Sequence, residues 1–67
     1  MRTEISTYYS DDGVAKAIVY FNGDIGHYEV EYQKAGRVLS VESYREHNLY
    51  YHEDAAENFV LGVKKFS

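Results

Sequence analysis

Three glycine-containing corners divide the first part of this chain into short segments of alternating apolar and polar residues. The corners are Asp11-Asp12-Gly13, Asn22-Gly23 and Gln33-Lys34-Ala35-Gly36, and each combines residues that favour turns. Alternating segments between such corners are typical of antiparallel strands joined by hairpins. The sequence therefore predicts four strands in meander order, at about residues 3–9, 14–21, 25–32 and 37–44.

The second corner is the strongest hairpin signal in the chain. A two-residue type I′ turn needs positive φ at both central residues, and Asn22-Gly23 is a favoured pair for it. This turn would place Val19 opposite Gly26 on an apolar face and Lys16 opposite Glu29 on the other face. A phosphate-binding loop would need a different glycine spacing and a following helix. We therefore expect a hairpin corner here.

The other two corners extend the same sheet. Asp11-Asp12-Gly13 fits a three-residue loop, which would set Ile5 opposite Val19. The apolar side of the first strand would then carry Thr3, Ile5, Thr7 and Tyr9. The third corner fits a two-residue or a four-residue loop, and both alternatives place Leu39 and Val41 on the same side as Val30.

After Tyr44 the apolar residues recur at helical spacing. The stripe consists of Leu49, His52, Ala56, Phe59, Val60 and Val63. It predicts a helix over about residues 49–64 with Asn48 as its N-cap, although a start near His52 is an alternative. We expect three acidic and two basic side chains to complement the helix dipole. They are Glu53, Asp54 and Glu57 near the start, and Lys64 and Lys65 near the end.

Gly62 lies inside the last turns of this predicted helix. A helical glycine costs about 1 kcal/mol relative to alanine, which indicates either close packing on the sheet or early fraying.

The expected fold is a single α+β domain over residues 1–67, a four-stranded antiparallel β-meander with one C-terminal helix on one face (ββββα). We expect the helix to cover the face formed by Ala15, Ala17, Val19, Tyr28, Val30, Leu39 and Val41. The chain has no cysteine, so neither a disulfide nor a thiolate zinc site can stabilise it. Its stability must come from packing.

Charge and hydropathy disfavour several classes of protein. Seven basic and eleven acidic residues give a net charge of −4, whereas nucleic-acid binders neutralise phosphates with Lys and Arg. No apolar stretch suggests a secretory signal or approaches the roughly 20 residues of a membrane helix. Together with the lack of cysteine, this predicts a cytoplasmic protein.

The opposite face of the sheet has no segment left to cover it. An open antiparallel face usually alternates to polar residues, so an open face rich in tyrosine, isoleucine and valine is a candidate interface. The residues that we expect to bind a partner there are Tyr8, Ile18, Tyr20, Ile25, His27, Val38 and Tyr44. The alternative is that these residues only reflect high strand propensity.

Three constellations could carry chemistry: two groups built around histidines, and the serines. His47 and His52 stand near carboxylates, but on a helix two residues five apart diverge by about 140°, which disfavours a shared metal ion. His27 with Glu29 and Glu31 resembles an acid and base set, yet it would lie on an open face without a pocket. No serine has a nucleophile-elbow context. We therefore expect no enzyme activity, no metal and no cofactor.

These observations favour a small non-enzymatic protein-binding or regulatory protein that acts through its open, tyrosine-rich face. A phage-type inhibitor or adaptor, whose acidic surface imitates nucleic acid, is one form of this class by analogy of size and charge. A homo-oligomeric structural protein that self-associates through the same face is one alternative. A single-stranded nucleic-acid-binding module is another, because aromatic sheet faces stack on bases.

Overall fold

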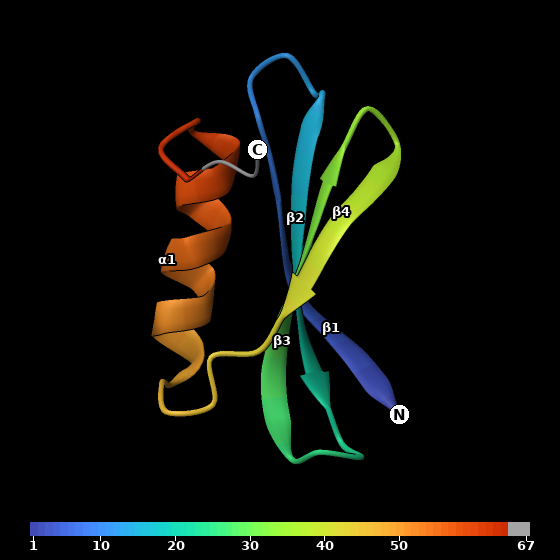
Figure 1. Ribbon diagram of the computed structural model, residues 1–67, viewed down its shortest axis with the longest axis vertical. Coiled ribbons are helices and arrows are strands. Elements are labelled where there is room, and N and C mark those ends of the chain that lie inside the picture. Colours follow the sequence, from blue (N-terminus) through green and yellow to red (C-terminus); the bar gives the residue numbers. More distant parts are fainter. Residues whose placement is uncertain (65–67) are drawn as a thin grey trace.

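One antiparallel sheet and one helix make up the computed structural model, which describes residues 1–64. The strands pair in the order β1-β2-β3-β4, as the sequence predicted. Their bounds are β1 Arg2–Tyr9, β2 Ala15–Asn22, β3 His27–Lys34 and β4 Arg37–Glu42, and the helix α1 spans Leu49–Val60. Figure 1 shows α1 on one side of the sheet, with no element on the other side. The predicted ββββα architecture is confirmed.

The β2–β3 corner is longer than the predicted two-residue turn. Asn22 pairs with His27, which leaves a four-residue loop, and Gly26 with φ +67° donates its N–H to the Asn22 carbonyl at 2.9 Å. This register pairs Val19 with Val30, so it brings together two large apolar side chains where the predicted register placed glycine opposite Val19. The shift is an even number of residues, and both strands therefore keep their predicted faces.

The β1–β2 loop is one residue longer than predicted, and this exchanges the two faces of the second half of β1. Ser10 donates its N–H to the Ala15 carbonyl at 3.0 Å, so the loop has four residues and Tyr9 pairs with Lys16. A slip of one residue turns a strand over, which places Tyr8 on the helix side and Thr7 and Tyr9 on the open side. The predicted faces of these residues are wrong.

A β-bulge at Ile5 then restores the predicted register in the first half of β1. Glu4 pairs with Tyr20 and Thr3 with Phe21, whereas Ser6 on the far side of the bulge pairs with Val19. The predicted pairing of Ile5 with Val19 is therefore wrong.

The β3–β4 corner is the true two-residue turn of the sheet. Ala35 and Gly36 have φ of +52° and +77°, as a type I′ turn requires, and Lys34 pairs with Arg37 across it. A second bulge at Leu39 follows, so that Val41 pairs with Glu31 on the open face. The predicted position of Val41 under the helix is wrong, because the bulge reverses the alternation.

The core lies between α1 and the middle of the sheet. Its buried members are Ala17, Val19, Val30, Tyr32, Ala56 and Phe59. The Phe59 ring packs edge-on against Tyr32, with centroids 5.1 Å apart. The helix packs across β1, β2 and β3, and no Cα atom of α1 lies within 8 Å of one in β4.

The helix begins as predicted and ends early. The Asn48 side chain accepts a hydrogen bond from the Tyr51 N–H at 3.1 Å, which confirms this N-cap. At the other end Gly62, with φ +84°, donates to the Phe59 carbonyl, and Val63 donates to Asn58. These bonds form a Schellman motif, so Gly62 terminates the helix instead of lying within it.

This early end changes the predicted helix surface. Val63 is 73% exposed and does not join the core stripe. The first turn of α1 carries no acidic residue and the last turn no basic one, so the predicted dipole pairing is wrong. Lys64 lies beyond the helix, and the prediction for Lys65 lies outside the described residues.

Candidate functional site

Only part of the predicted partner-binding set lies on the open face. Ile18, Tyr20 and Val38 are there, because they pair with residues whose side chains also point away from α1. Ile25 lies in the β2–β3 loop. The other three predicted residues are Tyr8, His27 and Tyr44, and all of them contact the helix or the segment before it.

Tyr44 is the largest departure from the prediction. The strand β4 ends at Glu42, and the chain then turns toward α1. The Tyr44 hydroxyl lies 2.7 Å from the Tyr32 hydroxyl and donates to Glu42 Oε1 at 2.6 Å, while its ring packs against Tyr51. Burial raises the pKa of both phenols, that of Tyr32 to about 12. Tyr44 therefore belongs to the helix side.

Tyr8 also lies on the helix side, because the β1–β2 loop is one residue longer than predicted. It packs against the core. Burial, followed by the negative charge of Glu53, raises the pKa of its hydroxyl. The neighbouring Ser6 hydroxyl donates to Glu53 at 2.7 Å and ties β1 to α1.

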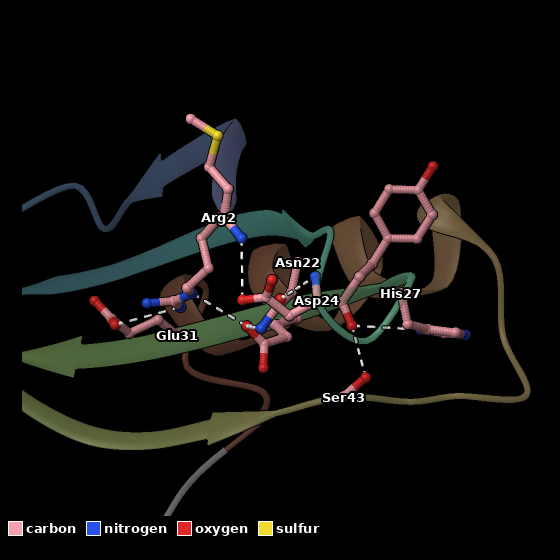
Figure 2. Close-up of polar contacts among 9 residues, drawn as sticks. Arg2, Asn22, Asp24, His27, Glu31 and Ser43 are labelled. Atoms are coloured by element: carbon pink, nitrogen blue, oxygen red, sulfur yellow. Dashed lines mark hydrogen bonds and ion pairs between the residues drawn. The ribbon is translucent and has the colours of Figure 1, made fainter.

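The open face is held together by a polar network around Arg2. Its guanidinium carbon lies 4.0 Å from the centroid of the Tyr20 ring, and its Nε donates to Glu29 at 3.1 Å. Nη2 lies 3.7 Å from Glu31, and Asn22 Nδ2 donates to the same Glu29 oxygen at 3.2 Å. Figure 2 shows Arg2 reaching toward Glu31 across the sheet. Much of the Tyr20 ring is thus covered by the chain itself.

The apolar surface of the open face therefore differs from the predicted one. Ile18 is only 4% exposed and offers little area to a partner. Val38 is 57% exposed, and two residues that the sequence placed on the other side, Tyr9 and Val41, add to it. The length of the β1–β2 loop brings Tyr9 to this face and the bulge at Leu39 brings Val41, so alternation alone could not have identified them.

Hydrogen bonds of His27 and Ser43 join the start of β3 to the segment before the helix. His27 Nε2 donates to the Arg45 carbonyl. The Ser43 hydroxyl donates to the Tyr28 carbonyl at 2.7 Å (Figure 2). The centroids of the His27 and His52 rings lie 5.6 Å apart. His27 thus faces this junction and does not form a set with Glu29 and Glu31.

His52 is fully buried, and both of its ring nitrogens are engaged by the backbone. Nδ1 donates to the Asn48 carbonyl at 2.7 Å, and Nε2 accepts the Tyr44 N–H at 3.1 Å. Burial lowers its pKa, which keeps the ring neutral. The third histidine, His47, stacks on Tyr51 with ring centroids 3.7 Å apart. Within residues 1–64 no group of three His, Cys, Asp or Glu side chains is arranged to hold a metal ion.

Two shallow hollows flank α1 on the side of β4. One is lined by Leu39, Phe59, Val60 and Lys34, and the other by Tyr44, Tyr51, Asn58 and Val63. Neither contains a histidine, and the hollow next to Lys34 has Asp12 as its single carboxylate. No helix among the described residues is long and apolar enough to cross a membrane.

A comparison with known proteins finds no matching family model, no similar curated protein and no similar solved structure. The function must therefore be inferred from the geometry of this chain.

Proposed function

We propose that the chain is a small non-enzymatic protein-binding or regulatory protein whose target binds the open face of the sheet. One observation carries the proposal. No element in residues 1–64 covers this face, yet it presents Tyr9, Val38 and Val41 to solvent, with Lys16 beside Tyr9 and Glu31 beside Val41. Exposed apolar side chains with a charged surround are typical of protein-binding surfaces.

The state of the titratable groups supports a binding role over catalysis. Both nitrogens of His52 are hydrogen-bonded to backbone groups, and Glu29 is paired with Arg2. A general acid or base needs a free position beside a substrate, in a site that excludes water. The three histidines instead join β3, the segment before α1 and the helix, while Glu29 and Glu31 pair with Arg2 of β1.

The charge of the open face supports a protein target over nucleic acid. Glu4, Glu29 and Glu31 contribute three carboxylates against Arg2 and Lys16, and a basic protein surface would complement them. The base-stacking alternative is weakened because Arg2 covers Tyr20, and because Tyr8 and Tyr44 lie on the other side. A compact acidic inhibitor or adaptor of the phage type is one form of this function. The lack of cysteine is consistent with a reducing compartment such as the cytoplasm.

Affinity capture with matched variants tests the proposal. We expect Tyr9→Ser combined with Val38→Thr to lose a target that the wild-type chain retains from host extract, by about thirtyfold in affinity, or about 2 kcal/mol. The control is Tyr50→Ser combined with Leu61→Thr, since both residues are exposed and lie on or just beyond α1.

The purified target is then titrated against both variants. Equal retention by the two variants would contradict the proposed face. Loss with the face variant alone, at an unchanged thermal midpoint, would support it.

A further inference from the structure

The outer edge of β4 pairs with no other strand of residues 1–64. In the order β1-β2-β3-β4 this strand pairs only with β3, and it lies at the margin of the sheet (Figure 1). The helix packs on the other three strands and leaves β4 uncovered. Three of its six residues, Val38, Leu39 and Val41, are exposed apolar side chains. An edge of this kind is a template for another strand.

The sequence of β4 is complementary to itself when it is read antiparallel. A twofold axis between Leu39 and Ser40 places Arg37 opposite Glu42 of a second copy, and Val38 opposite Val41. The axis repeats each pair, which gives two opposite-charge pairs and two apolar pairs in one short interface. Such cross-strand pairs are the units that stabilise antiparallel sheets.

The bulge at Leu39 places these partners on matching faces. Val38 pairs with Gln33 and Val41 with Glu31, so both valines lie on the open face although they are three residues apart. In a regular strand, residues three apart point to opposite faces.

The charged residues match in the same way. Arg37 and Glu42 pair with Lys34 and Val30 and lie on the helix side. A twofold axis perpendicular to the sheet keeps each face together, so both types of pair can form at once.

We propose that two copies of this chain associate antiparallel through β4 in this register. The two four-stranded sheets become one continuous sheet, with both helices on the same face. The pairing goes beyond the proposed function, because it uses the edge of the sheet and joins two open faces into one wider surface. A closed twofold contact of this kind is the commonest form of homo-oligomer.

The charges along β4 favour this partner. Arg37 stands directly opposite Lys34, so two like charges meet at the end of the hairpin. The carboxylate of Glu42 from a second copy would lie beside this pair and offset the repulsion. Within its own chain Glu42 accepts the Tyr44 and Ser40 hydroxyls and lies 4.0 Å from Lys64 Nζ, yet one third of its side chain stays exposed to a second copy. A six-residue contact is small, so we expect a dimer with a dissociation constant of about micromolar, which weakens as salt rises.

Charge exchange tests the register. We expect Arg37→Glu and Glu42→Arg each to weaken dimerisation by about tenfold or more, because each creates two like-charge pairs across the axis. An equimolar mixture of the two variants should restore association, since every pair then has opposite charges. Sedimentation equilibrium measures both effects. Wild-type behaviour of the single variants, or a mixture that stays monomeric although both variants are folded, would overturn the proposal.

Cysteine cross-linking provides a second test that leaves Glu42 and its contact with Tyr44 intact. The chain contains no cysteine, so oxidation of a mixture of Val38→Cys and Val41→Cys should give a disulfide-linked dimer. Val38→Cys alone should not, because the two copies of residue 38 are offset along the paired strands. Equal cross-linking of both samples, or none in the mixture, contradicts the register.

The two proposals fail separately. A wild-type chain that stays monomeric, but whose Tyr9 and Val38 variant loses the target, overturns the dimer and leaves the proposed function intact. A chain that dimerises as described, but whose face variant retains the target, overturns the proposed function and leaves the dimer intact.

Discussion

At the residue scale, His52 shows how a polar side chain becomes part of a small core. A buried polar group is costly unless its hydrogen-bonding atoms are satisfied. The Asn48 carbonyl and the Tyr44 N–H satisfy both nitrogens of this ring. His52 thereby closes the segment between β4 and α1, and its position in the apolar stripe has a structural explanation.

We expect this arrangement to make the protein sensitive to acid. Because burial depresses the pKa of His52 in the folded state, the unfolded state binds a proton more readily. The contribution of buried His52 to stability is complete above the pKa of histidine in the unfolded chain, about 6.5, and is lost as pH falls below that value. Urea unfolding at pH 7.5 and 5.5 should therefore show a smaller free energy of unfolding at the lower pH.

Matched variants isolate His52 from the other histidines that lie around it, His27 and His47. His52→Gln should be less stable at pH 7.5 and should lose most of the difference between the two pH values. His47→Gln, at an exposed position, should keep that difference. A wild-type protein with equal stability at both pH values would contradict the role given to His52.

At the element scale, the corners decide how the strands pair. The sequence places turn residues at all three corners, but loop length depends on which pairing buries the better side chains. At Asn22 the four-residue loop brings Val19 opposite Val30. The positive φ values expected at Asn22-Gly23 occur instead at Ala35 and Gly36.

Two glycine substitutions distinguish these turns. Gly36→Ala should destabilise the fold by about 1 kcal/mol, because φ +77° is strained for any residue with a Cβ atom. Gly23→Ala should have a much smaller effect, since Gly23 has no positive φ and its added Cβ atom would lie 3.4 Å from the Met1 carbonyl oxygen. Thermal midpoints of the two variants test the difference, and equal losses would be inconsistent with these turn geometries.

At the scale of the whole molecule, one helix closes one face of the sheet and completes the core with Ala56 and Phe59. A chain of this size has little stability to spare. Phe59 is 6% exposed and packs on Tyr32 at the centre of the core.

Phe59→Ala should cost about 3–5 kcal/mol and unfold much of the population at 25 °C. Tyr50→Ala, on the exposed side of the same helix, should cost less than about 1 kcal/mol. Circular dichroism during urea unfolding measures both variants. A folded Phe59→Ala protein of near wild-type stability would contradict the assigned core.

The sequence by itself determined the number and order of the elements and the start of the helix. These features depend on local chemistry: glycines at corners, an asparagine that can cap a helix, and a change of period after Tyr44. The middle strands β2 and β3 kept their predicted faces even though their register moved, because the shift was even. The faces of these two strands were thus predictable without the exact pairing.

Only the tertiary structure decided which side chains reach the open face. A difference of one residue in a loop, or one bulge, turns a strand over, and neither leaves a local signature when the competing loops are all rich in Asp, Asn and Gly. Tyr8 and Val41 exchanged sides for this reason, and Tyr44 did so because β4 ends at Glu42 and the chain then turns toward α1. The same bulge at Leu39 aligned Val38 with Val41, because the extra residue interrupts the regular alternation of β4.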